Sequence, residues 1–136
     1  MVLAKTKVSN PANTLIKVNA INAFSDNYIW IISSHLTDDV ALVDPGDAQV
    51  CIDFIEKQRQ QKPQLKLTSI HVTHHHADHI GGITQLAEYC HQHGWLLTIY
   101  LPKNDAISLN LTDNESANLV KVSEGDNIDL LAENLP

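Results

Sequence analysis

Thr73-His74-His75-His76-Ala77-Asp78-His79 contains four of the eight histidines of the chain within seven residues. The residues before it, Leu67–Thr73, are rich in β-branched side chains and predict a strand, and Gly81-Gly82 and a helical pattern follow it. Strand-to-helix corners at the carboxyl end of a parallel sheet are where α/β proteins place their sites. This segment therefore predicts an α/β fold with a functional site at such a corner.

The spacing of these histidines favours metal binding. In extended backbone, His74 and His76 point to the same side and can converge on one ion. Asp78 and His79 lie where the chain turns into the helix, and they can reach a neighbouring ion. Imidazole nitrogens together with a carboxylate oxygen suit Zn²⁺, and also Fe or Mn. A metal-storage tract or an accidental run would need neither a preceding strand nor an acid at a fixed place, so we interpret the cluster as a catalytic type of metal site.

The other histidines are interpreted as structural. His91 and His93 fall near the end of a predicted helix, where residues two apart point about 200° away from each other and cannot chelate one ion. Positive charge at the carboxyl end of a helix is the better explanation for this pair. His35 lies in a predicted turn and His71 in the body of a predicted strand.

Two amphipathic helices and several strands are expected around the cluster. The first helix follows Asp47, a favourable N-cap residue, and ends before Pro63, whereas the second carries apolar residues from Ile83 to Cys90 and stops at Gly94. From residue 40 onward strands and helices alternate, which implies right-handed crossovers and a largely parallel sheet. The strands are expected at Leu15–Ile21, Tyr28–Ser33, Val40–Val43, Leu67–Thr73 and Trp95–Leu101, with a hairpin of Asn118–Val122 and Ile128–Leu131.

The composition indicates one globular domain that binds neither nucleic acid nor membrane. The chain has 136 residues, a length close to that of one domain of ~150 residues, and 43% of its residues are apolar. Its 16 acidic residues outnumber its 9 basic ones, and Arg59 is the one arginine, which argues against binding to a phosphate backbone. The longest apolar run, Tyr28–Ile32, is far shorter than the ~20 residues that a membrane span needs.

The cysteines and the N-terminus favour a cytoplasmic location. Cys51 and Cys90 lie on helical segments and form no CxxC motif, which is typical of reduced core thiols. Lys5 and Lys7 precede the polar Ser9-Asn10-Pro11, where a secretory signal would have an apolar segment. We therefore expect a cytoplasmic protein.

Three segments together resemble a known family. Residues 73–79, THHHADH, are similar to the THxHxDH signature of the metallo-β-lactamase superfamily. Phe24-Ser25-Asp26-Asn27-Tyr28-Ile29-Trp30 and Val43-Asp44-Pro45-Gly46-Asp47 resemble segments of glyoxalase II, the hydroxyacylglutathione hydrolases. The resemblance, clear from about Leu15 to Leu101, implies an αββα sandwich. Residues 1–136 would supply about its first half, one mixed sheet with its helices.

The resemblance also implies a site for two metal ions. His74 and His76 would bind the first ion, and Asp78 and His79 the second; both would be Zn²⁺, with Fe or Mn as the alternatives. Asp44 would support the metal loop from beneath, although a turn-forming Asp before Pro-Gly is the simpler interpretation. The implied reaction is hydrolysis of S-lactoylglutathione to glutathione and lactate by a hydroxide shared between the metals, which is the last step of methylglyoxal detoxification.

The family pattern needs three more ligands, a His, a bridging Asp and a last His, which lie in later segments. No His follows His93, and the sequence given ends at Pro136. We therefore expect part of a single domain, truncated before the remaining ligands, with a partial metal site and little or no activity of its own. An inner sheet face without its partner sheet would favour aggregation or dimerisation, although the parent enzyme is expected to be a monomer.

Two other kinds of function remain open. The first is another member of the superfamily: a persulfide dioxygenase, a lactonase or a β-lactamase. The second is a metal-binding or interaction fragment without catalytic activity. Metal identity and a substrate panel would separate the first from a glyoxalase II, and coding sequence for a Pro-Gly-His-Thr loop after Pro136 would argue against the second.

Overall fold

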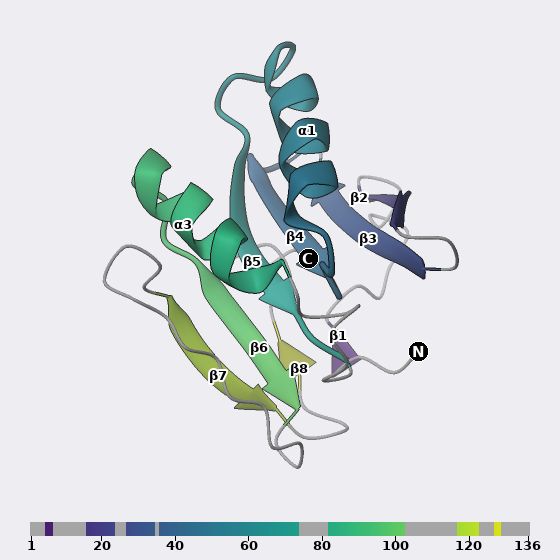
Figure 1. Cartoon of the computed structure of the whole chain (residues 1–136), viewed down its shortest axis with the longest axis vertical. Coiled ribbons are helices and arrows are strands. Elements are labelled where there is room, and N and C mark those ends of the chain that lie inside the picture. Colours follow the sequence, from purple (N-terminus) through teal and green to yellow (C-terminus); the bar gives the residue numbers. More distant parts are fainter. Residues whose placement is uncertain are drawn as a thin grey trace.

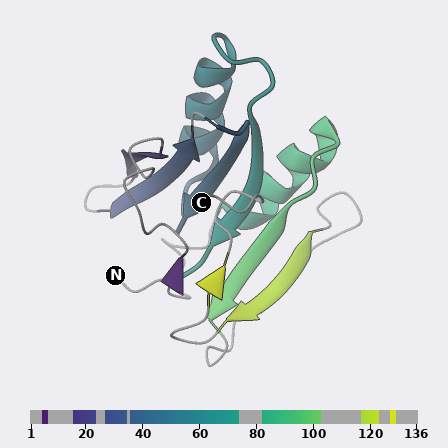
Figure 2. The same ribbon diagram turned by 180° about the vertical axis from the view of Figure 1, so that it is seen from behind.

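A computed structural model describes residues 5–6, 16–23, 27–34, 36–73, 82–102, 117–122 and 127–128. Within these residues a six-stranded sheet has the order β2-β3-β4-β5-β6-β7, and two helices lie on one of its faces (Figure 1, Figure 2). The strands of this sheet are β2 (Ile16–Ala23), β3 (Asn27–Ser34), β4 (Asp39–Val43), β5 (Lys66–His71), β6 (Thr98–Pro102) and β7 (Asn118–Val122). A separate two-stranded parallel sheet consists of β1 (Lys5–Thr6) and β8 (Asn127–Ile128).

The sheet is mixed, and its parallel part follows the expected crossovers. β2, β3 and β4 are antiparallel neighbours, whereas β4, β5, β6 and β7 run parallel to one another. The helix α1 (Ala48–Arg59) connects β4 to β5, and α3 (Ile83–His93) lies between β5 and β6 in the sequence. The prediction of an α/β fold with a largely parallel region after residue 40 is therefore confirmed.

The predicted hairpin of residues 118–122 and 128–131 is wrong. β7 pairs in parallel with β6, with Val120 opposite Tyr100, and β8 pairs with β1 instead. Ala117, directly before β7, packs against the main core. Pairing with β6 thus gives this segment apolar contacts that an isolated two-stranded hairpin would lack.

Local sequence signals determine where the helices begin and end. The Asp47 carboxylate accepts the backbone N–H of Gln49 at 3.0 Å and caps α1, as expected. α3 ends at Gly94, whose φ of 73° is the left-handed conformation that glycine adopts readily. Among the described residues no helix could cross a membrane, since α1 has 12 residues and α3 has 11, against the ~20 that a span needs.

Both helices pack their apolar faces on the sheet and form one core. Its buried members include Ile31, Leu42, Cys51, Ile55, Leu67, Ile70, Leu86, Cys90 and Ile99. Cys51 and Cys90 are free thiols, and burial raises the pKa of each to about 12. The prediction that both lie in the core and form no disulfide is confirmed.

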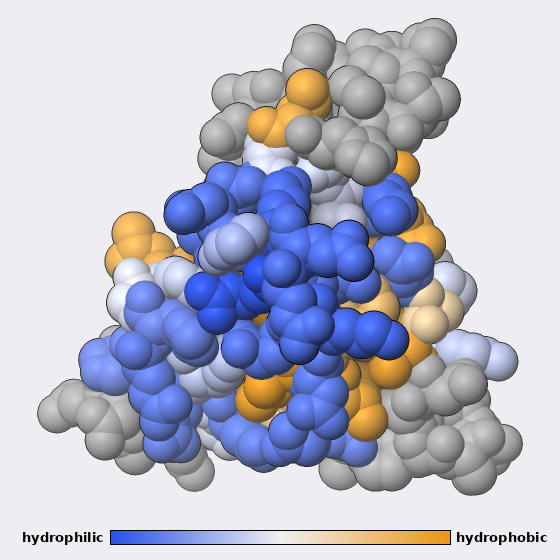
Figure 3. Space-filling view, turned by 90° about the horizontal axis from the view of Figure 1, so that it is seen from above, coloured by the Kyte–Doolittle hydropathy of each residue, from blue (hydrophilic) through white to orange (hydrophobic). Residues whose placement is uncertain are grey.

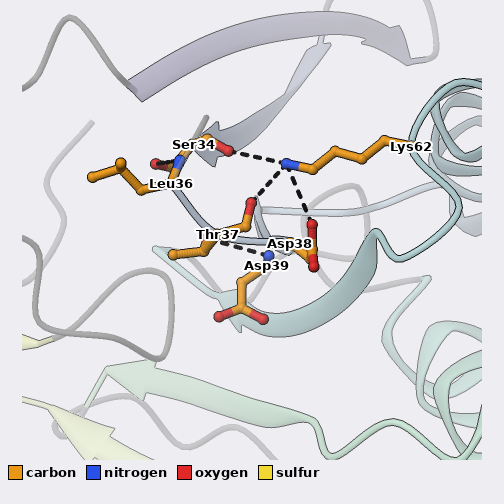
Figure 4. A network of polar contacts seen from close by, with 6 residues as sticks. All are labelled: Ser34, Leu36, Thr37, Asp38, Asp39 and Lys62. Carbon is orange, nitrogen blue, oxygen red and sulfur yellow. Dashed lines mark hydrogen bonds and ion pairs between the residues drawn. The ribbon is translucent and has the colours of Figure 1, made fainter.

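Polar contacts of one lysine join two connections at the end of the sheet where the parallel strands begin. Lys62, in the connection from α1 to β5, donates to the carbonyl oxygens of Thr37 at 2.7 Å and Ser34 at 3.3 Å (Figure 4). Its Nζ also lies 3.6 Å from a carboxylate oxygen of Asp38. Hydrophilic residues cover most of the middle of this end (Figure 3). The predicted metal site belongs to the opposite end, where the parallel strands finish.

A polar and aromatic cluster joins the two helices. The Tyr89 hydroxyl donates to the Glu56 carboxylate, which also accepts from Arg59 at 3.2 Å. The Arg59 guanidinium lies over the ring of Trp95, 5.1 Å from its centroid, and His93 stacks on that ring at 4.3 Å. Because Glu56 and Arg59 belong to α1 and the other three to α3 and the segment after it, the cluster fixes the helices against each other.

The sheet face away from the helices carries a buried imidazole. His71 is 1% exposed, its ring stacks on Tyr100 at 4.8 Å, and its Nε2 lies 3.1 Å from the Ser69 hydroxyl oxygen. Its Nδ1 has no hydrogen-bond partner among the described residues. Burial lowers the pKa of His71 to about 4, so the imidazole is neutral at neutral pH.

Apolar side chains on this same face differ in exposure. Ile32 and Val43 are buried, whereas Val18, Tyr28 and Val120 are exposed. The expected open apolar face is therefore present only in part, as far as the described residues extend.

His71→Phe tests the buried imidazole, because it removes the titrating group and keeps an aromatic ring against Tyr100. The unfolded chain takes up a proton on this residue near pH 6.5, and the folded chain does so only near pH 4. The free energy of unfolding should therefore fall as the pH drops through this window, by about 3 kcal/mol from His71 alone. Chemical denaturation at several pH values should show this component in the wild type and not in the variant; parallel pH profiles would contradict it.

Candidate metal centre

The four predicted metal ligands, His74, His76, Asp78 and His79, lie outside the described residues. The structure describes their flanks: Thr73, after the end of β5, and Gly82, before α3. We name residues 74–81 the histidine loop. The structure shows the contacts that hold the two ends of this loop.

Asp44 directly follows β4 and has a fixed and unusual backbone conformation. Its φ of 53° is the one positive φ among the described non-glycine residues. This left-handed region costs most residues ~1–2 kcal/mol, and Asp is among the few that tolerate it. The Asp44 N–H donates to the His71 carbonyl at 2.9 Å, and the Asp44 carbonyl accepts from Gly46 at 2.9 Å. Two backbone hydrogen bonds therefore hold the residue in this conformation.

The Asp44 carboxylate is directed at the start of the histidine loop. Asp44 is 3% exposed, and its Oδ1 accepts the backbone N–H of Thr73 at 2.7 Å. Its Oδ2 accepts the hydroxyl of the same threonine. Since Thr73 directly precedes His74, the acid fixes the chain where the loop begins. This is the contact expected of an acid that supports the loop from beneath, and that role stays a prediction.

The other end of the histidine loop is held by the next residue of the same turn. The Pro45 carbonyl accepts the Gly82 N–H at 3.0 Å, and the Gly82 carbonyl accepts from Leu86 at 3.0 Å in the first turn of α3. Both ends of the loop are thus bound to consecutive residues, Asp44 and Pro45. No role for Pro45 is predicted from the sequence, because a contact of a backbone carbonyl leaves no signal in the side-chain pattern.

Aromatic side chains of β3 lie at the same end of the sheet. Trp30 is opposite Val43, the last residue of β4, and Val43 is opposite His71. Tyr28 lies two residues farther toward this end, is 55% exposed, and has its ring 6.1 Å from that of Trp30. The sequence places both residues in an expected strand and in the family resemblance, and it predicts no functional role for either.

The structure also describes His91 and His93, which the sequence predicts to be structural. Among the described residues, no three His, Cys, Asp or Glu side chains gather in a way that could hold a metal ion. His91 and His93 lie in the last turn of α3, as predicted, and His93 packs against Tyr89 and Trp95. His35 lies outside the described residues.

A cleft of about 770 Å³ lies at the opposite end, where the parallel strands begin. Its lining includes Asp38, Arg59, Lys66, Trp95 and Leu96. Two of its charged groups are already engaged, because Asp38 pairs with Lys62 and Arg59 pairs with Glu56. None of the described residues that line this cleft belongs to the predicted metal site.

Comparison with known proteins relates this arrangement to a family. The sequence profile of the metallo-beta-lactamase superfamily matches residues 24–102, a range that includes Asp44, the histidine loop and α3. A hydroxyacylglutathione hydrolase of Shewanella oneidensis is 43% identical over 94 residues, which are 68% of this chain and 33% of that relative. A hydroxyacylglutathione hydrolase of Pseudomonas fluorescens is 39% identical over 104 residues, which are 74% of this chain and 37% of that relative.

The chain spans about a third of the length of these curated relatives. The superfamily profile, by contrast, covers more than half of the chain. The described residues form a mixed sheet with two helices on one face, as the resemblance implied. This chain belongs to the metallo-β-lactamase superfamily.

Proposed function

We propose that this chain is part of a metal-dependent hydrolase of the glyoxalase II type, which hydrolyses S-lactoylglutathione to glutathione and lactate. The observation that carries the proposal is the pair of hydrogen bonds between Asp44 and Thr73. A turn after β4 would not require both oxygens of a buried carboxylate on the residue directly before the histidine loop. The relatives are named hydroxyacylglutathione hydrolases, which supports a glutathione thioester as the substrate.

The donor atoms of the histidine loop fit divalent metal ions. Three imidazoles and one carboxylate suit Zn²⁺, with Fe or Mn as the alternatives. His74 and His76 would hold one ion, and Asp78 and His79 a second, with further ligands from segments that this sequence does not contain. When bound, the ions would supply an acidic water as the nucleophile and would polarise the thioester carbonyl.

The residues of this chain would set the geometry in which that chemistry occurs. Asp44 holds the start of the histidine loop by its contacts with Thr73. Residues that orient metal ligands in this way are worth ~10–100-fold in metal affinity or activity. The leaving glutathione thiol has a pKa of ~8.5, so its departure as a thiolate needs no strong general acid.

We propose in addition that residues 1–136 form part of one domain and bind metal weakly by themselves. Two ligands for each ion are fewer than the ~3 protein ligands of catalytic zinc sites, and no His follows His93. The free thiols of Cys51 and Cys90 support a reducing, cytoplasmic location.

Asp44→Asn tests the support of the histidine loop. The amide keeps the size of the side chain but removes its negative charge. The Thr73 hydroxyl then has to accept from the new NH₂ group instead of donating, so two charge-assisted hydrogen bonds become weaker neutral ones. We expect the affinity for Zn²⁺, measured by competition with a chromophoric chelator, to fall about tenfold or more. Asp47→Asn is the matched control, because Asn caps α1 as well as Asp does. Equal affinity of the Asp44 variant and the wild type would remove the main support for the proposal.

The two tryptophans can report where a metal ion binds. Trp30 lies beside Val43 at the end of the sheet that carries the histidine loop, whereas Trp95 precedes β6 at the other end. The five residues of β6 span about 17 Å between these two ends. We expect Co²⁺ to quench Trp30 in a Trp95→Phe variant more strongly than it quenches Trp95 in a Trp30→Phe variant. Replacing His74 and His76 by Ala should abolish the difference. Equal quenching of both tryptophans would indicate another metal site.

Thioester hydrolysis tests the substrate and the completeness of the site. The zinc-loaded chain of 136 residues should hydrolyse S-lactoylglutathione poorly or not at all, because each ion would have two of its protein ligands. Two tightly held ions with fast turnover would refute the partial site. A substrate panel should then contain the thioester, a lactone, a β-lactam and a glutathione persulfide. Any activity that remains should be highest on the thioester. Preference for another member of the panel would overturn the assigned substrate.

A further inference from the structure

Gly82 lies where the histidine loop, α1 and α3 meet. Its N–H donates to the Pro45 carbonyl at 3.0 Å, and Pro45 directly follows the acid that holds Thr73. Ala48, three residues after Pro45, is the first residue of α1, and Gly82 is the N-cap of α3. One short turn thus contacts both ends of the histidine loop and both helix starts.

The space around Gly82 admits no side chain. A Cβ atom at this position would lie 2.7 Å from the Pro45 carbonyl oxygen and 2.7 Å from the Ala48 nitrogen. Both are backbone atoms, so neither can move aside as a flexible side chain would. The Gly82 φ of −95° is allowed for any residue, so the requirement for glycine comes from close approach.

The surroundings of this contact are rigid. Ile83 and Leu86, which follow Gly82 in α3, are fully buried in the core, and Ala48 is 4% exposed. Closely packed interiors of this kind transmit strain instead of absorbing it. A displacement of Gly82 from Pro45 would therefore change the separation of the two ends of the histidine loop.

We propose that Gly82 is a positioning residue for the metal site: its contact with the Pro45 carbonyl fixes the end of the histidine loop relative to the start held by Asp44. This inference rests on the proposed function, since it takes residues 74–81 to be the metal-binding segment. A loop whose two ends are already fixed loses less conformational freedom when it binds an ion. The linkage is reciprocal, so a bound ion should in turn stabilise the contact between Gly82 and Pro45.

Gly82→Ala is the direct test, with zinc affinity and the free energy of unfolding measured on the same variant. We expect the affinity for Zn²⁺ to fall about tenfold or more, and the visible spectrum of the Co²⁺ form to change because the ligand geometry changes. Leu97→Ala is the matched control: it removes a buried core side chain at the other end of the sheet and leaves the Gly82 contact in place. The zinc affinity of this control should stay within about twofold of the wild type, because substitutions at distant sites without shared partners act independently.

A measurement on the wild type keeps the test independent of whether the variant folds. Zinc should slow hydrogen exchange of the Gly82 amide, which is bonded to Pro45, and of the Thr73 amide, which is bonded to Asp44. It should leave the Asn118 amide, bonded to the Leu97 carbonyl at the other end of the sheet, unchanged.

The outcomes separate this inference from the proposed function. Zinc bound by the wild type and equally well by Gly82→Ala would overturn the inference alone, as would slowed exchange at Thr73 without slowed exchange at Gly82. If the wild type binds no zinc, or if its zinc binding does not require His74 and His76, the proposed function and this inference are overturned together.

Discussion

The pair of hydrogen bonds from Thr73 to the buried Asp44 carboxylate is the constraint on which the proposed site depends. Hydrogen bonds to a charged group are stronger than neutral ones, and burial from water strengthens them further. They hold the chain before His74, while two backbone hydrogen bonds, to His71 and from Gly46, hold Asp44 in its left-handed conformation. Hydrogen bonds therefore join the end of β4, the turn into α1 and the entry to the histidine loop.

The central part of the fold could be predicted because its signals are local. Asp47 caps α1 and Gly94 ends α3, and the apolar residues of both helices recur at helical spacing. Alternation of strand and helix then left the parallel crossover as the expected connection. The position of β7 could not be predicted in this way, since its partner β6 ends 16 residues earlier and no local pattern distinguishes pairing with β6 from a hairpin.

The candidate site follows from the sequence only to the extent that its chemistry resides in side chains, and its four ligands stay a prediction. The spacing of His74 and His76 predicts a metal site, and Asp44 emerged from the family resemblance as a supporting acid. The contact between Pro45 and Gly82 could not be anticipated, because it joins two backbone groups 37 residues apart. The cluster of Glu56, Tyr89 and Trp95 was missed for the same reason of distance along the chain.

The two buried thiols have a consequence under the proposed function. The thiolate is the form of cysteine that attacks acyl groups and disulfides, and burial raises the pKa of Cys51 and Cys90 to about 12. Both sulfur atoms are also shielded from solvent. Neither could therefore take an acyl group from an S-acylglutathione or form a mixed disulfide with oxidised glutathione. Under the proposed function, these two residues of the core would offer no reactive thiol to the substrate or to the glutathione that the reaction releases.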